Sequence, residues 1–316
     1  MHSSTSNSKF PLEYKLLTAT AILLAIMLTI VGIIRPIGKT RGMDPLSQLS
    51  QKMRWHEQFD IVFGGDSRTQ RGVSPGAIEK ELPNKKVANF GFSAACLDPK
   101  YLSHLKKLIK KQSKKPTIVL GVTALSLTAY AQKNNAYLEY AKKHRAEHYL
   151  NAHFGHILHF FRRYKKDEIK QLLGYARAHD YYEYAKNDGW IQSNRRPHIP
   201  RYALKEYEKL LNKHPFVPKL QEDLLVKVHE LTKAGVRVFA FRPPTTKEMA
   251  ELEKKLCAFD KDKFIEEFKS YGGKWIEVDD RNYRSYDGSH IDEKSAVKFS
   301  KDLAKALVNH YMTSGN

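Results

Sequence analysis

The feature that most limits the fold of this chain is a run of nineteen residues without a charge, residues 16–34. As a helix that rises about 1.5 Å per residue, this run is about 28 Å long, close to the hydrocarbon thickness of a bilayer. Arg35-Pro36 follows it, and this is unlike the small-residue cleavage site of a secretory signal. We therefore expect an uncleaved transmembrane anchor over 16–34 behind a tail over 1–15, with a cleaved signal peptide as the alternative.

The charges that flank the run do not decide its orientation. Lys9 and Lys15 precede it, and Arg35, Lys39 and Arg41 follow it. This count favours a cytoplasmic C-terminal side, but long domains are translocated largely regardless of nearby charge. The charges alone leave the side open.

Composition narrows the classes of partner. The 54 basic and 34 acidic residues give a net charge of +20, which favours anionic partners such as lipid headgroups or acidic polymers. Two cysteines are too few for a disulfide framework or a zinc ribbon. No zinc finger, RNA-recognition motif or helix-turn-helix pattern accompanies the charge, so we expect no nucleic-acid partner.

The rest of the chain alternates short apolar runs with helical periods. Strands are expected at 61–63, 87–90, 117–122, 236–241 and 275–278, and helices over 101–111 and 293–311. This pattern predicts an α/β domain over 59–314, with a parallel sheet of about five strands covered by helices on both faces. We interpret 35–58 as a stalk. Residues 124–235 are interpreted as a helical insertion that caps or lines the site, with Gly189-Trp190 and Arg195-Arg196-Pro197 in a loop.

One serine stands where such sheets place their reactive groups. Gly64-Gly65-Asp66-Ser67 follows the first expected strand, so a tight turn would expose the Ser67 hydroxyl at the carboxyl edge of the sheet. Its backbone amide would be free to donate. The alternative is that Asp66 or Ser67 only caps the next helix.

A second motif lies near the other end of the domain. Asp287 precedes His290 by three residues, in the loop between the fifth strand and the last helix. A carboxylate at this spacing can accept from one imidazole nitrogen while the other nitrogen faces a serine, which makes an oriented general base. The alternative is an exposed loop with helix-capping residues. Both motifs at the expected edge predict a triad of Ser67, His290 and Asp287.

With these motifs the chain resembles the SGNH (GDSL-type) hydrolase superfamily of serine esterases and acyltransferases, which has a flavodoxin-like fold. The matching blocks are Gly65-Asp66-Ser67, Asn89-Phe90-Gly91 and Asp287-x-x-His290. The resemblance implies that Ser67 is the nucleophile, His290 the base and Asp287 its orienting partner. It also implies oxyanion donors at the amides of Ser67 and Gly91, and no cofactor.

The third block departs from the family pattern. The family usually has Gly-x-Asn-Asp after the third strand, and its asparagine is an oxyanion donor. Here the stretch reads Gly121-Val122-Thr123-Ala124. Loss of one such donor can cost about 10²–10³ in rate. Thr123, Ser126 or a residue of the insertion could replace the asparagine as oxyanion donor.

This departure and the anchor together resemble one branch of the superfamily. The architecture is similar to membrane-anchored SGNH-like proteins of cell-surface polymer acylation, of the alginate O-acetylation and teichoic acid D-alanylation types. There, a membrane-bound O-acyltransferase exports an acyl group, and the anchored partner acts outside the cytoplasm, on the periplasmic or outer face. The resemblance implies an O-acyltransferase that takes an acyl donor and a hydroxyl-bearing surface glycan or lipid. An SGNH esterase and a non-catalytic binding or scaffold module remain as alternatives.

Further side chains are candidate ligands of a substrate or a metal. Arg68 follows the serine and is a candidate clamp for a carboxylate or phosphate, together with Arg71, or else lies on a helix surface. Arg242 ends the fourth strand and is a candidate for lining the site. The spacing of four histidines invites a metal interpretation, but no carboxylate stands between them and their neighbours favour packing, so we expect no metal. These histidines are His148, His153, His156 and His159.

Overall fold

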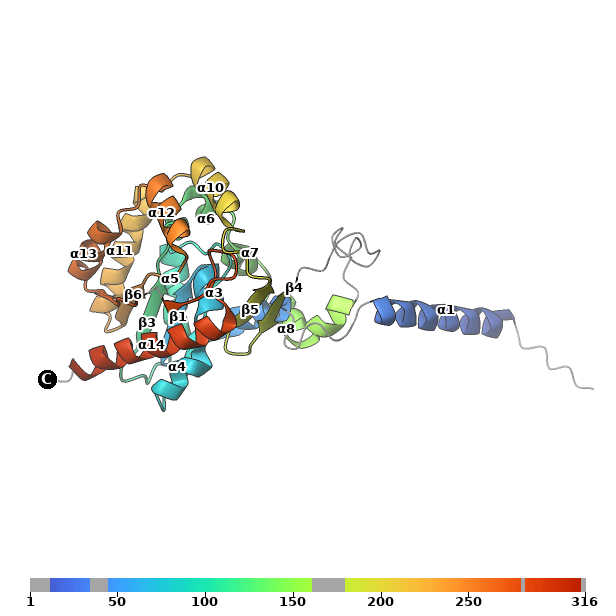
Figure 1. Ribbon diagram of the computed structural model, residues 1–316. Coiled ribbons are helices and arrows are strands. Elements are labelled where there is room, and N and C mark those ends of the chain that lie inside the picture. The colour runs from blue at the N-terminus through green and yellow to red at the C-terminus, as the bar shows by residue number, and fades with distance from the viewer. Residues whose placement is uncertain (1–11, 35–44, 161–179, 280–281, 314–316) are drawn as a thin grey trace, which may run out of the picture. The chain divides into compact units, whose positions relative to one another are not determined.

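The computed structural model describes residues 12–34, 45–160, 180–279 and 282–313 (Figure 1). Contacts divide the chain into two units. One contains residues 1–39 and 157–177, and the other contains residues 40–156 and 178–316. Residues 1–11 of the expected tail, residues 35–44 of the stalk and residues 161–179 of the insertion lie outside the described residues. Residues 12–15 of the expected tail are helical.

The first unit contains helix α1 (Leu12–Ile34). Within it, Leu12–Thr29 is long and apolar enough to cross a membrane, and none of its residues is buried by the protein. The hydroxyls of Thr18, Thr20 and Thr29 donate to the carbonyl four residues earlier, at 2.7–2.8 Å. These bonds satisfy the three threonine hydroxyls within the helix, as a lipid environment requires. The helix therefore has the properties expected of an anchor.

The second unit is built around five parallel strands in the order β2-β1-β3-β6-β7. They are β1 (Ile61–Gly65), β2 (Val87–Asn89), β3 (Thr117–Gly121), β6 (Arg237–Phe241) and β7 (Lys274–Trp275). The prediction of a parallel sheet of about five strands is confirmed. Gly65 pairs with Gly121 and Gly121 with Phe241, so three strands end level. The residues that follow these strands therefore lie along one edge, where the order reverses between β1 and β3 and ligands bind in open sheets.

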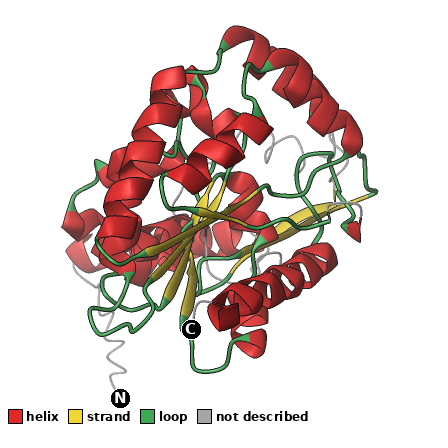
Figure 2. Ribbon diagram, turned by 90° about the vertical axis from the view of Figure 1, so that its left-hand side faces the viewer, coloured by secondary structure: helices red, strands yellow, loops and turns green. Residues whose placement is uncertain are grey.

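Helices cover both faces of the sheet (Figure 2). Side chains alternate along each strand, so Ile61 and Phe63 enter one apolar core while Val62 enters the other. The first face packs against α4 (Pro75–Glu81) and α14 (Glu293–Thr313), and the second against α5 (Pro99–Leu108), α11 (Pro218–Lys233) and α13 (Lys261–Ser270). This double cover explains why the strands read as continuous apolar runs.

Part of the segment interpreted as a stalk packs into this unit. Helix α2 (Pro45–Arg54) buries four polar side chains, those of Ser47, Gln48, Ser50 and Lys52. The Gln48 amide donates to the carbonyls of Lys186 and Trp190 at 2.9 Å. Lys52 donates to the carbonyl of Gly91 at 2.8 Å. Residues 45–54 therefore belong to the α/β unit, because their polar groups find partners there.

The segment interpreted as a helical insertion also contains strands. An antiparallel hairpin pairs β4 (Asp180–Ala185) with β5 (Ile191–Arg196), which places Arg195 and Arg196 in a strand and Gly189 at the turn. Helix α11 is the crossover to β6. The other described helices include η1 (Leu125–Leu127), α6 (Ala129–Lys133), α7 (Ala136–Ala141), α8 (Arg145–Phe160), α10 (Leu204–Lys213) and α12 (Lys247–Leu256). The hairpin was missed because its residues are polar and aromatic rather than apolar.

Candidate active site

Ser67 is the first residue of helix α3 (Ser67–Gly72), which begins directly after β1. Asp66 caps this helix, because its carboxylate accepts the Arg68 amide at 3.0 Å. The capping interpretation therefore holds for Asp66 and leaves the Ser67 hydroxyl free for other contacts.

Two glycines let α3 approach the strand ends closely. A Cβ atom at Gly65 would lie 2.3 Å from the Thr69 hydroxyl, and one at Gly121 would lie 1.9 Å from it. Gly65 also has a φ of 149°. Thr69 of α3 therefore occupies the space that side chains on β1 and β3 would fill, and this seats the helix against the sheet.

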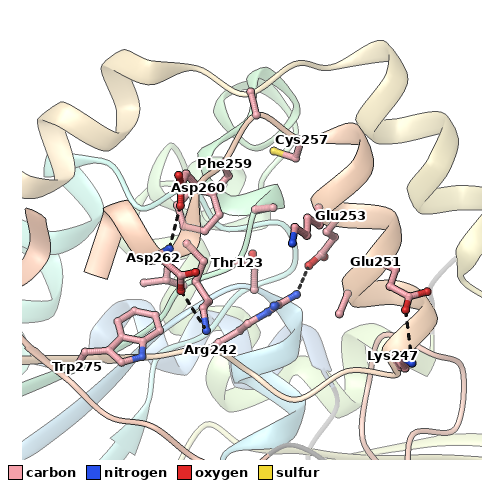
Figure 3. A pocket seen from close by; sticks show the side chains of 16 residues that line it. Thr123, Arg242, Lys247, Glu251, Glu253, Cys257, Phe259, Asp260, Asp262 and Trp275 are labelled. Carbon is pink, nitrogen blue, oxygen red and sulfur yellow. Dashed lines mark hydrogen bonds and ion pairs between the residues drawn. The ribbon is translucent and has the colours of Figure 1, made fainter. Parts of the chain in front are cut away.

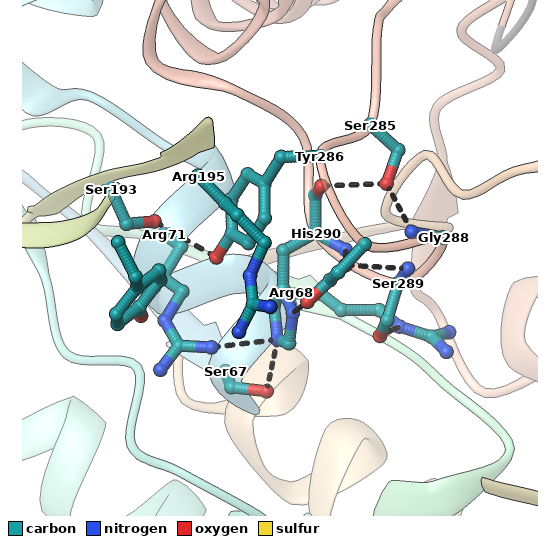
Figure 4. Close-up of polar contacts among 12 residues, drawn as sticks. Ser67, Arg68, Arg71, Ser193, Arg195, Ser285, Tyr286, Gly288, Ser289 and His290 are labelled. Atoms are coloured by element: carbon teal, nitrogen blue, oxygen red, sulfur yellow. Dashed lines mark hydrogen bonds and ion pairs between the residues drawn. The ribbon is translucent and has the colours of Figure 1, made fainter. Parts of the chain in front are cut away.

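The structure brings together the three residues of the predicted triad. The Ser67 Oγ lies 2.9 Å from His290 Nε2, although the two residues are 223 positions apart (Figure 4). His290 Nδ1 lies 2.8 Å from Asp287 Oδ2, and the other Asp287 oxygen accepts the amides of Ser289 and His290 at 2.8 and 2.7 Å. This network fits a tautomer with the proton on Nδ1, which leaves Nε2 to accept from serine.

Burial and nearby charges determine the protonation states of Asp287 and His290. Burial disfavours the charged Asp287 carboxylate, but attraction to His290 and the hydrogen bonds outweigh burial and lower its pKa to about 2. The pKa of His290 is lowered, first by burial and then by the positive charge of Arg71, which together outweigh Asp287. At neutral pH the aspartate is therefore ionised and the histidine is a neutral base.

Arg71 and Ser67 both contact the same nitrogen of His290, Nε2. Arg71 lies one turn after Ser67 on α3, and its Nη1 is 3.1 Å from His290 Nε2. Its Nη2 donates to Glu183 of β4 at 2.7 Å. A neutral imidazole has one lone pair on Nε2, so the arginine and the serine hydroxyl compete for it.

The three expected oxyanion donors differ in their contacts. Ser67 begins α3, where a helix provides no acceptor for its amide. The Gly91 amide instead donates to Asn89 Oδ1 at 2.9 Å, which argues against the expected role. The Thr123 hydroxyl donates to Asp66 Oδ2 at 2.6 Å, and Ser126 is bonded within the same turn. The Thr123 hydroxyl thus stabilises the turn that contains Asp66. Both hydroxyls already donate to other acceptors, so neither is available as an oxyanion donor beside Ser67.

Arg68, a candidate clamp, and Arg242, a candidate for lining the site, are both paired with one buried carboxylate. Arg68 lies 2.6 Å from one oxygen of Glu253, and Arg242 lies 3.2 Å from the other. The Arg68 Nε also donates to Ser289 Oγ at 3.0 Å. Arg68 is 3% exposed and does not face solvent. Through Ser289 it stabilises the loop that carries His290.

Arg242 also lines a cavity of about 720 Å³ (Figure 3). Thr123 and Glu253 line it as well, together with residues of α12 and the start of α13. Ser67 and His290 are not among its lining residues. Arg242 follows the last residue of β6 at the carboxyl edge and lines this cavity, which Ser67 and His290 do not line.

Several contacts of the triad were not anticipated. The Tyr286 ring stacks on His290 with centroids 5.9 Å apart, and its hydroxyl lies 3.1 Å from Ser193 of β5. The Ser289 hydroxyl donates to Tyr207 of α10 at 2.8 Å. No periodicity marks these residues, and the contacts of Tyr286 with Ser193 and of Ser289 with Tyr207 join distant parts of the chain.

The histidines weighed as metal ligands have other partners where they are described. His148 Nε2 lies 3.0 Å from the Tyr140 carbonyl, and His153 lies 2.7 Å from Arg54. The side chains of His156 and His159 lie outside the described residues. Within the described part of the chain, no group of three potential metal-binding side chains is found.

Sequence comparisons do not assign the chain to a family. No protein-family model and no curated protein matches it. The resemblance to SGNH hydrolases therefore stays a prediction carried by the three sequence blocks.

Proposed function

We propose that this protein is a membrane-anchored serine acyl-transfer enzyme of the SGNH type, which acylates a hydroxyl group on a cell-surface glycan or lipid. The observation that carries the proposal is the line of hydrogen bonds from Ser67 Oγ to His290 Nε2, at 2.9 Å, and from His290 Nδ1 to Asp287, at 2.8 Å. This arrangement has the geometry of a nucleophile, a general base and an orienting carboxylate.

The chemistry proceeds in two steps through one serine ester. His290 Nε2 takes the Ser67 proton as Oγ bonds to the acyl carbonyl carbon, and the protonated histidine then donates that proton to the leaving group. In the second step, His290 takes a proton from the acceptor hydroxyl, whose oxygen attacks the ester. Ser67 leaves and recovers its proton, and Asp287 remains ionised throughout.

Limited access to solvent supports transfer over hydrolysis. Ser67 is 9% exposed and His290 8% exposed, so bulk water has little access to the ester. A bound acceptor hydroxyl would then compete effectively with water. Helix α1 supports an anchor at the membrane where such acceptors and a membrane-bound O-acyltransferase partner are expected. If water is the acceptor, the same residues make an esterase.

The decisive experiment is active-site labelling. The purified chain is treated with a fluorophosphonate probe, and the modified residue is located by mass spectrometry. We expect modification of Ser67 and a loss of at least about 10³-fold in labelling rate for Ser67→Ala and His290→Ala. Ser270→Ala is the matched control, because that exposed serine lies on α13. Equal labelling of Ser67→Ala and the wild type excludes the proposal.

Transfer and hydrolysis are then separated by adding an acceptor. The acyl-enzyme formed from 4-nitrophenyl acetate is followed with and without an oligosaccharide. Transfer gives an acetylated sugar in proportion to the released nitrophenol, whereas hydrolysis gives acetate at the same rate in both samples.

A further inference from the structure

Two arginines from different elements lie beside the triad with donors that have no acceptor in the described part of the chain. Arg71 comes from α3 and Arg195 from β5, and Figure 4 shows both side chains directed toward the region of Ser67 and His290. Neither residue belongs to the three catalytic positions.

Arg195 is held in place by aromatic rings. Its guanidinium carbon lies 3.8 Å from the ring centroid of Tyr202 and 5.8 Å from that of Tyr181. The Tyr181 ring lies 6.0 Å from Tyr286, whose ring stacks on His290. This chain of rings connects Arg195 to the base of the triad.

Among the described residues, the charge of Arg195 has no carboxylate partner. Its Nε and Nη1 are buried without a hydrogen-bond acceptor, and none of the described carboxylates forms an ion pair with it. The Nε of Arg71 is also buried without an acceptor, although its Nη2 reaches Glu183. Buried guanidinium donors left unpaired are costly, so three of them around one site require an explanation.

We infer that Arg71 and Arg195 form a binding site for an anionic oxygen group, a carboxylate or a phosphate, on the substrate that reaches Ser67. A carboxylate and a phosphate each have several oxygen acceptors that can bind a planar guanidinium. The inference rests on the proposed function and names the chemical class of its substrate. An anion bound to Arg71 would also draw its Nη1 away from His290. The lone pair on His290 Nε2 would then be free to accept the proton of the Ser67 hydroxyl.

The test compares two esters that differ in charge. The full-length protein in detergent is assayed with mono-4-nitrophenyl succinate, which carries a carboxylate, and with neutral 4-nitrophenyl butyrate. We expect Arg195→Gln to lower kcat/KM for the charged ester about 10-fold or more and to change that for the neutral ester less than about twofold. A role in packing alone would lower both values equally.

A matched control comes from the same strand. Arg196 is exposed and next to Arg195, so its side chain leaves the hairpin on the other face. Arg196→Gln should keep the ratio of the two esters. Arg195→Lys guards against misfolding of the glutamine variant, because it keeps the charge but loses the planar fork, and it should lie between the wild type and Arg195→Gln.

Free anions distinguish the two ligand chemistries. Inorganic phosphate and acetate are tested as competitive inhibitors at constant ionic strength. Stronger inhibition by phosphate supports a phosphate-bearing substrate, and stronger inhibition by acetate supports a carboxylate. If neither anion inhibits and Arg195→Gln affects both esters equally, the inference is overturned.

The same experiments keep this inference separate from the proposed function. Acylation of Ser67 with no preference for charge leaves the function standing and removes the anion site. If Ser67 is never acylated, calorimetric titration of the Ser67→Ala chain with phosphate and with acetate decides. Binding that is lost in Ser67→Ala/Arg195→Gln supports the anion site without the enzyme, whereas no binding removes both.

Discussion

His290 has two hydrogen-bonding neighbours at one nitrogen, and this shapes its behaviour as a base. Ser67 Oγ lies 2.9 Å from Nε2, and Arg71 Nη1 lies 3.1 Å from it. Burial and the arginine charge both lower the pKa of the histidine. The base therefore stays neutral, and able to act, further into the acid range than an exposed histidine.

Replacing Arg71 should change the pH dependence of the reaction. In Arg71→Gln the pKa of His290 should rise, because the positive charge of Arg71 no longer lowers it, although burial still does. The acid limb of kcat/KM for neutral 4-nitrophenyl butyrate should therefore move to higher pH, so that activity falls at acid pH. At alkaline pH the base is neutral in both proteins. The pH profile measures this shift.

Arg196→Gln is the control for that profile, because its exposed side chain has no contact with His290 in the described part of the chain. An acid limb that stays in place or moves to lower pH in Arg71→Gln would contradict the assigned cause.

The position of helix α3 depends on empty space at the ends of two strands. The Thr69 hydroxyl fits where Gly65 and Gly121 have no Cβ atoms. That hydroxyl is buried and has no hydrogen-bond partner among the described residues. Its function is thus to fill space, and the fit keeps the first turn of α3, with Ser67, at the sheet edge.

A double-mutant cycle tests this seating. Gly121→Ala should destabilise the protein by about 1–3 kcal/mol and slow the labelling of Ser67, because the new methyl overlaps Thr69. Thr69→Ala should cost less, since its hydroxyl has no partner. In Thr69→Ala/Gly121→Ala the 1.9 Å overlap is gone, and the tight contacts that remain are with Pro243 and the Cβ of residue 69, both at 3.2 Å. Stability and labelling should therefore recover in large part, with coupling of about 0.5–3 kcal/mol. Chemical denaturation measures the stabilities.

Gly76→Ala provides the control for the added methyl. A Cβ there meets only Asp188, at 3.9 Å, within helix α4, so the change should stabilise the fold by about 0.4–1 kcal/mol. A double variant as unstable as Gly121→Ala would show that Thr69 is not what excludes the side chain.

Helix α2 connects the start of the α/β unit to the loop after β2. Lys52 is fully buried, and burial lowers its pKa to about 7, against the attraction of Asp188. Its amine donates to the Gly91 carbonyl, while the Gly91 amide is bonded to Asn89. Both backbone polar groups of Gly91 are thus engaged, which holds this loop close to α3.

At the scale of the whole molecule, α1 should decide where the protein resides. The full chain should remain with membranes after alkaline carbonate extraction, because Leu12–Thr29 is long and apolar enough to cross a membrane and carries no charge after Lys15. A chain that lacks residues 1–39 should be released and still be labelled at Ser67, since the second unit begins at residue 40.

Mass spectrometry of the membrane-bound protein separates an anchor from a cleaved signal peptide. An intact mass of 36.5 kDa means that residues 16–34 are retained. Release of the full chain by carbonate, or a mass that lacks this segment, would contradict an anchor.

The sequence by itself determined the features that depend on neighbouring residues. The uncharged run, the apolar strands, the glycine turn before Ser67 and the spacing of Asp287 and His290 all act within a few residues, so their patterns are visible in the chain. Parallel strands also bring their carboxyl ends together, which made the meeting of Ser67 and His290 predictable.

Only the tertiary structure decided which polar groups share that edge. It placed Arg195 beside the triad on a hairpin, paired Arg68 and Arg242 with one glutamate, and bonded the Gly91 amide to Asn89. Such contacts join residues far apart in the chain or depend on side-chain orientation. The free energies of these contacts depend on how deeply each group is buried and on which acceptor lies nearest to each donor in the folded protein. Neither can be predicted from neighbouring residues in the sequence.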